Sequence, residues 1–181
     1  TNKDDVRVQT IEHLMAALAG TGVHNALIEI DGPEVPILDG SSQEFVKKIL
    51  SVGKKALNVP VNGFKVTKSI IVTDGSAWAK FTPAEVLSIE FYIDYSDTVI
   101  GRQNLTLSMK NGTFVRELCD SRTFCRESDI SSLKSKGFAK GGTLNNAIVL
   151  QSDKVQNSEG LRRFDECVRH KMLDAMGDLS L

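Results

Sequence analysis

The stretch from Glu166 to Leu179 places a histidine and an aspartate four residues apart. If this stretch is helical, His170 and Asp174 stack on one face with their Cβ atoms about 6 Å apart. A histidine and a carboxylate at this spacing can hold one metal ion between them, or they can simply hydrogen-bond to each other. The metal alternative constrains the fold most, because a catalytic zinc ion takes three protein ligands and the third must come from a distant segment.

The best source of a third ligand is Glu12-His13 in the first predicted helix. His24 lies in a predicted loop without acidic neighbours, which is typical of a surface histidine. Added to His170 and Asp174, the Glu12-His13 pair would supply three ligands and a spare carboxylate that could take a proton from an attacking water. Alternatively, Glu12 is only an acid placed favourably in the first turn of a helix. The sequence does not show whether the two helices meet.

Composition narrows the class of protein. A chain of 181 residues with 41% hydrophobic and 25% charged residues is typical of a soluble globular protein with one large or two small domains. The net charge of −1 gives no reason to expect nucleic acid or a membrane surface as the main partner. No apolar run is long enough for a stable membrane insertion. The three cysteines form no CxxC pair, which favours reduced thiols and a cytoplasmic location.

The first half alternates between strand and helix patterns. The predicted elements are a strand at 6–9, a helix at 11–19, a strand at 25–30 and a helix at 43–50. We expect Thr10 to cap the first helix and Gly20 to end it. The turn-rich segment 31–42 is a predicted loop, in which Ser41 or Ser42 can cap the second helix.

Strand patterns dominate the second half, so we place a domain boundary near residue 58, between a first domain at 1–58 and a second at 59–181. Strands are predicted at 64–72, 78–81, 87–95, 105–108 and 147–150, with short helices at 113–118 and 130–136 and the closing helix after 161. The apolar residues between 130 and 149 are explained by core packing or, alternatively, by a channel for an acyl chain.

The two histidine-bearing helices share a short sequence pattern. His, Met and Gly occur in the same register in residues 13–20 and in residues 170–177. This agreement could reflect a duplicated pair of βα layers that face each other, or it could be chance.

Five blocks along nearly the whole chain resemble the zinc-dependent UDP-3-O-acyl-N-acetylglucosamine deacetylases of lipid A biosynthesis. They occur in the order and spacing of that family. The blocks are Thr10-Ile-Glu12-His13-Leu-Met-Ala-Ala-Leu18, Glu34-Val-Pro-Ile-Leu-Asp39-Gly-Ser-Ser42, Ser121-Arg-Thr123-Phe124, Gly141-Gly-Thr-Leu144 and Val168-Arg-His170-Lys171-Met-Leu-Asp174-Ala-Met-Gly-Asp178-Leu179.

The resemblance implies a complete set of zinc ligands and three further catalytic residues. The implied ligands are His13, His170 and Asp174, and the same ligands could hold Fe²⁺. The implied catalytic residues are the general base Glu12, the oxyanion-stabilising Thr123, and Asp178, which would orient a catalytic histidine. Taken without the resemblance, Thr123 and Asp178 are explained equally well by packed and solvated side chains.

The resemblance also implies a substrate, a UDP-linked acylated amino sugar that loses its acetyl group as acetate. Substrate contacts are implied for Phe124, Lys171 and, near the uridine, Tyr95. A βαβ insert at about 124–150 would form the passage for the acyl chain, with Ile130, Ala147 and Val149 in its lining. We expect a monomer.

The fold implied by the resemblance is α+β, with two βα layers related by duplication and helices sandwiched between two sheets. Family members also have a segment before the Glu-His helix and a later segment with a Gly-His motif that supplies a general acid. Only residues 1–9 of the first segment occur here and the later segment does not, so we expect a central fragment. The alternative to a deacetylase is therefore a zinc- and UDP-sugar-binding fragment without turnover.

Overall fold

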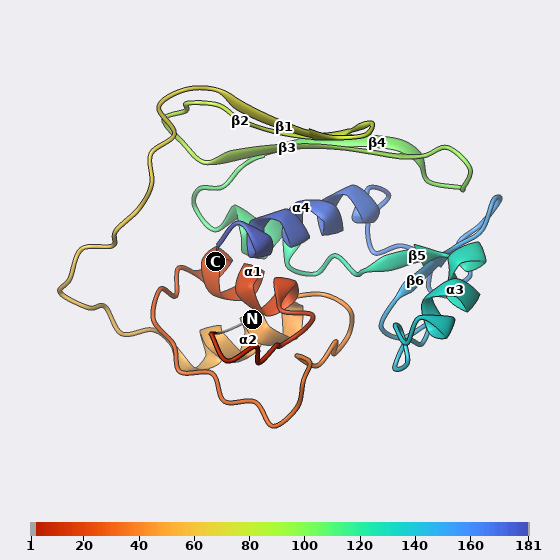
Figure 1. The fold of residues 1–181 in the computed structure, drawn as a ribbon, viewed down its shortest axis with the longest axis horizontal. Helices are drawn as coiled ribbons and strands as arrows, with labels where there is room; N and C mark the ends of the chain where they lie inside the picture. Colours follow the sequence, from red (N-terminus) through yellow and green to blue (C-terminus); the bar gives the residue numbers. More distant parts are fainter. Residues whose placement is uncertain (1–2, 181) are drawn as a thin grey trace.

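The computed structural model describes residues 3–180 and confirms an α+β fold, with helices and three two-stranded sheets. Helix α4 (Glu166–Asp178) packs along α1 (Glu12–Thr21) at the centre of the molecule (Figure 1). Helix α2 (Gln43–Val52) lies on the other side of α1 from α4. Among the described helices, none combines the length and the apolar character needed to cross a membrane.

Helix α1 ends two residues later than predicted, because its glycines have different roles from those expected. Gly22 adopts a left-handed conformation, with φ of 73°, and closes the helix, with the Val23 N–H donating to the Leu18 carbonyl. Gly20 instead lies where a Cβ atom would come within 2.0 Å of the Phe114 ring. The predicted cap at Thr10 is also wrong, because that hydroxyl donates to Glu34 Oε1 at 2.6 Å.

The strands predicted at 6–9 and 25–30 are wrong for the described chain. Only Gln9 forms a β-bridge, to Glu34, and residues 23–30 form no strand. Leu27 is 88% exposed. A strand needs a hydrogen-bonded neighbour, and no described segment pairs with 25–30. The predicted duplication and the sandwich of helices between two sheets stay predictions.

Two antiparallel hairpins follow. Strands β1 (Ile70–Asp74) and β2 (Ala77–Phe81) pair with each other and are exposed on both faces. Strands β3 (Ser88–Tyr95) and β4 (Gly101–Ser108) pair over eight residues and lie over α4 (Figure 1). Alternate residues of β3 and β4 are the more buried ones, as expected for a sheet with one face on a core.

A π-helical turn, η1 (Phe114–Leu118), stands where a short helix was predicted. It leads to a βαβ unit, in which β5 (Phe124–Arg126) and β6 (Ile148–Leu150) pair in parallel. The crossover between them holds a 3₁₀ turn, η2 (Glu127–Asp129), and helix α3 (Ile130–Ser135).

Helix α4 contributes to both hydrophobic cores. Met172 and Leu173 are fully buried with residues of α1, α2 and η1, whereas Cys167 and Val168 are fully buried with residues of β3 and β6. Helix α4 therefore joins the core formed with α1, α2 and η1 to the core formed with β3 and β6. All three cysteines are free, and burial raises the pKa of Cys119 to about 11 and of Cys167 to about 12.

Gly177 allows the close approach of α4 to α1, and its substitution gives a first prediction. A Cβ atom at this position would lie 2.1 Å from the carbonyl oxygen of Glu12. We expect Gly177→Ala to lower the free energy of unfolding by about 1–3 kcal/mol, since one helix must shift. Denaturant titration of Gly141→Ala is the control, because nothing lies within 4 Å of that Cβ position. Equal stability of both variants would contradict the prediction.

Candidate metal centre

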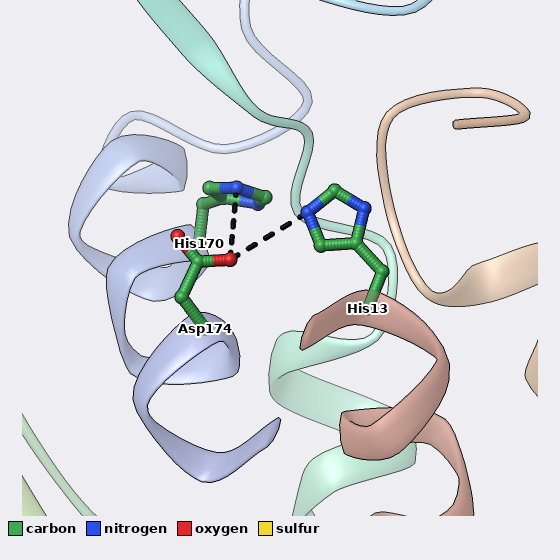
Figure 2. A group of neighbouring side chains, drawn as sticks. All are labelled: His13, His170 and Asp174. Carbon is green, nitrogen blue, oxygen red and sulfur yellow. Dashed lines mark ion pairs between the residues drawn. The ribbon is translucent and has the colours of Figure 1, made fainter. Parts of the chain in front are cut away.

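His13, His170 and Asp174 come together where α1 and α4 meet (Figure 2). Each offers one ligand atom, and these atoms all lie within 4.8 Å of one another. His170 Nε2 is 3.2 Å from Asp174 Oδ1, and His13 Nε2 is 3.5 Å from the same oxygen. The two imidazole rings meet edge to face, with centroids 5.0 Å apart. His13 is more than 150 positions away from His170 in the sequence, but the fold brings their side chains together around Asp174.

The protonation of His170 suits a metal ligand. Its Nδ1 lies 3.0 Å from the carbonyl oxygen of Ser121. A carbonyl only accepts, so Nδ1 carries the proton and the lone pair is on Nε2, which faces Asp174. His170 is 1% exposed, and this burial lowers its pKa to about 4, although the charge of Asp174 opposes the shift. The imidazole is therefore neutral at pH 7.

Asp174 is anionic at the same pH. Burial alone would raise the pKa of its carboxyl group, but His170, His13 and Lys171 together hold that pKa well below the ordinary value. Lys171 Nζ donates to Asp174 Oδ2 at 3.0 Å, which leaves Oδ1 facing the histidines. Neutral imidazoles and an ionised carboxylate are the protonation states that metal binding requires.

The three residues fit a zinc ion. Asp174 Oδ1 is buried without a hydrogen-bond partner, an arrangement that is costly unless another group satisfies the oxygen. His13 Nδ1 is buried and unpartnered as well. Tetrahedral coordination with bonds of about 2.0–2.1 Å separates ligand atoms by roughly 3.3 Å. Two of the three separations, 3.2 and 3.5 Å, lie on either side of that value, and all three are within 4.8 Å. A tetrahedral ion held by these two nitrogens and one oxygen would keep one position open.

Three of the predicted substrate contacts lie together beside this cluster. The Phe124 ring is 6.3 Å from the His170 ring and 5.1 Å from the Tyr95 ring, centroid to centroid. Lys171 Nζ lies 5.5 Å from the centroid of Phe124. The Arg126 guanidinium carbon lies over the Tyr95 ring, 4.4 Å from its centroid. Pairwise contacts therefore link His170 through Phe124 to Tyr95, and each of these two aromatic rings also contacts a cation.

The predicted catalytic residues occupy different positions around the cluster. Glu12 is half-buried, directly before His13, and its carboxylate forms no hydrogen bond or ion pair with the described chain. Asp178 lies one turn after Asp174 on the exposed end of α4, and partial loss of hydration together with the charge of Asp174 raises its pKa. Thr123 is joined to neighbouring segments by its backbone, with its N–H donating to the Gly40 carbonyl at 2.7 Å.

The three predicted acyl-passage residues lie in the βαβ unit. Ile130 begins α3 and is half-buried, Ala147 precedes β6 and is half-buried, and Val149 is buried within β6. A passage formed by these residues stays a prediction.

Sequence reasoning missed the residues that support the ligands. Ser42 Oγ donates to the backbone carbonyl of His13 at 2.7 Å. Ser121 accepts from His170, and Glu166 binds the backbone N–H of Arg122. One signal was available for Glu166, which precedes His170 by four residues and so shares its face of the helix.

A family model described as LpxC, UDP-3-O-acyl N-acetylglycosamine deacetylase, matches residues 1–181. The chain belongs to this family. Three relatives named UDP-3-O-acyl-N-acetylglucosamine deacetylase illustrate the similarity. Over 180 residues, 45% are identical to the protein of Histophilus somni and 43% to that of Pasteurella multocida, and over 179 residues 46% are identical to that of Myxococcus xanthus.

The alignments cover 98–99% of this chain but only 57–59% of each relative. The chain therefore spans just under three-fifths of the length of the deacetylases that it matches. Family members are metalloenzymes, in agreement with the ligand cluster, and the resemblance inferred from the five sequence blocks is confirmed.

The cluster predicts a single zinc ion per chain. We expect Asp174→Asn to weaken zinc binding roughly 100-fold or more, because the only anionic ligand is lost, a larger change than is typical of outer-shell substitutions. Competition with a chromogenic chelator would measure the dissociation constant. Asp178→Asn, on the same helix but outside the cluster, should leave zinc binding within a few-fold. No zinc bound by the unsubstituted chain would contradict the assignment.

Burial of His170 predicts a pH-dependent stability of the metal-free chain. The pKa falls from 6.5 to about 4 on folding, so the unfolded state takes up the proton first as the pH drops. Stability should therefore be complete above pH 6.5 and decline toward pH 4, by up to about 3 kcal/mol. Denaturant titrations at several pH values would show this slope. The slope should shrink in His170→Gln and persist in His24→Gln, since His24 is exposed.

Proposed function

We propose that the chain carries the zinc-dependent centre of a deacetylase that hydrolyses the acetamide of UDP-3-O-acyl-N-acetylglucosamine. The supporting observation is the convergence of His13, His170 and Asp174 with a free carboxylate, Glu12, directly beside one ligand. The relatives carry the name of this activity. The products are acetate and the free amine, and the reaction is the committed step of lipid A biosynthesis.

His13, His170 and Asp174 would hold the ion, which when bound supplies a Lewis acid and an activated water. The oxygen of the water forms a bond to the carbonyl carbon of the acetyl group, and Glu12 accepts the proton that the water loses. The Glu12 carboxylate is suited to this role, since no partner within residues 3–180 occupies it. The same ligand set could hold Fe²⁺ in place of Zn²⁺.

The carbonyl oxygen becomes negatively charged as the tetrahedral centre forms. We assign the Thr123 hydroxyl as a donor to this oxygen. Support comes from the backbone of Thr123, which is hydrogen-bonded to Gly40 on one side and to Ile148 on the other and so holds a defined position. The C–N bond then breaks, and the nitrogen gains a proton. We assign Asp178 to orienting the donor of that proton.

The remaining predicted residues would recognise the substrate. Lys171 and Phe124 lie beside the ligands and would contact the sugar, and Tyr95 would stack near the uridine. For the 3-O-acyl chain we propose the apolar side chains of the βαβ unit, with Ile130, Ala147 and Val149 in the lining.

We also propose that the two layers arose by duplication and sandwich the helices between two sheets. The shared register of His13 and His170, each on a helix and each facing Asp174, supports this relation.

The role of Glu12 gives a prediction that separates binding from catalysis. Glu12→Gln should keep zinc affinity within a few-fold but lower acetate release from the UDP-linked substrate by about 10²–10⁴-fold, as expected for loss of a general base. Glu29→Gln, an exposed carboxylate, is the matched control. Full activity of Glu12→Gln would exclude the assignment. Zinc and UDP-sugar binding without turnover by the unsubstituted protein would instead favour a binding fragment.

A further inference from the structure

The peptide group between Ser121 and Arg122 lies between two residues of α4. Its N–H, on Arg122, donates to Glu166 Oε1 at 3.0 Å. Its carbonyl, on Ser121, accepts from His170 Nδ1 at 3.0 Å. The two ends of a trans peptide point in opposite directions, and Glu166 and His170 lie on one face of the helix, one turn apart. One peptide group therefore links the carboxylate of Glu166 to the imidazole of His170 by hydrogen bonds.

We propose that Glu166 is a positioning residue that acts on His170 through this peptide. Metal-bound histidines usually donate their second ring N–H to a carboxylate or a carbonyl, which fixes the ring and raises its basicity. Here both groups are present in series. The Ser121 carbonyl contacts the His170 ring directly, and the Glu166 carboxylate binds the other end of the same peptide group. This inference rests on the proposed metal site.

The coupling has a physical basis. A carboxylate that accepts a peptide N–H polarises the peptide, and its carbonyl becomes a stronger acceptor for the next donor. The effect is large only where water is excluded. Glu166 is 0% exposed, and His170 and Ser121 are each 1% exposed. The hydrogen-bonded series is thus shielded from solvent along its whole length.

The buried charge of Glu166 is balanced by Arg122 itself. Arg122 Nε donates to Glu166 Oε1 at 3.0 Å and Nη2 to Oε2 at 3.3 Å. The same guanidinium reaches Glu159 Oε1 at 2.7 Å and the Gly160 carbonyl at 2.8 Å. The backbone N–H of Arg162 also donates to Glu166. These bonds surround the carboxylate with donors and fix the peptide group between Ser121 and Arg122.

The alternative is that the ion pair of Arg122 and Glu166 only stabilises the fold. The two hypotheses predict different zinc affinities when both charges are removed together, because replacing a buried pair with apolar side chains is often neutral for stability. A structural pair would then leave zinc affinity unchanged. A positioning pair would lose its effect on His170 even in a stable protein.

The test compares Arg122→Met/Glu166→Leu with the unsubstituted chain. We expect the zinc dissociation constant, measured by chelator competition, to rise about 10- to 100-fold, the range for outer-shell changes. In the metal-free protein, long-range ¹H–¹⁵N NMR should show His170 as the Nδ1–H tautomer in the unsubstituted chain and as a mixture in the variant. Glu166→Gln, which keeps the side-chain shape, should change both readouts in the same direction and decides the matter if the double variant does not fold.

The matched control is Arg169→Met/Asp165→Leu. This pair joins the same helix to η1, with Arg169 Nε 2.7 Å from Asp165 Oδ1 and Nη1 3.0 Å from Glu117 Oε2. It does not touch the Ser121–Arg122 peptide, so zinc affinity should stay within a few-fold. Unchanged affinity and tautomer in the Glu166 variants, or equal losses in the control, would overturn the proposal while the metal site stands. Absence of zinc binding by the unsubstituted chain would overturn both.

Discussion

The close packing of α4 on α1 is the contact on which the rest of the structure depends. Gly177 permits it, because its missing Cβ leaves room for the backbone of Glu12. Two of the candidate metal ligands lie on α4 and the third on α1, so their convergence follows directly from this crossing. The apolar residues of α4 extend into both cores, and the helix thereby transmits the same constraint to β3, β6 and η1.

Polar contacts then refine the positions that packing sets. The segment from Ser121 to Thr123 is held from three sides, by Glu166, by His170 and by the Gly40 carbonyl. The loop that contains Gly40 also holds His13 through Ser42. Burial keeps His170 neutral while its neighbours keep Asp174 ionised. The arrangement of the candidate ligands is therefore the result of exclusion of water combined with a few directed hydrogen bonds.

Local patterns predicted most of the fold. The helices at 43–52, 130–135 and 166–178 and the strands β2 and β3 appeared close to the expected bounds, because amphipathic periodicity and Asp-Gly or Asn-Gly turns are local signals. The other two hairpin strands differ from the prediction, since β1 begins at Ile70 and not at residue 64, and β4 begins at Gly101 and not at residue 105. The strands at 6–9 and 25–30 failed, since an alternating pattern forms a strand only beside a pairing partner. The cap expected at Thr10 failed for a similar reason, as its hydroxyl is bound by the distant Glu34.

The sequence by itself determined the class of fold, the family and the candidate ligands, because residue types at short spacing and five ordered blocks are readable without coordinates. It could not determine that His13 meets His170 and Asp174, nor that Glu166 reaches His170 through a peptide of another segment. Those relations join residues far apart in the chain. Only the tertiary structure decided them, since they depend on the distance of closest approach between two helices and on which buried polar groups pair when water is excluded.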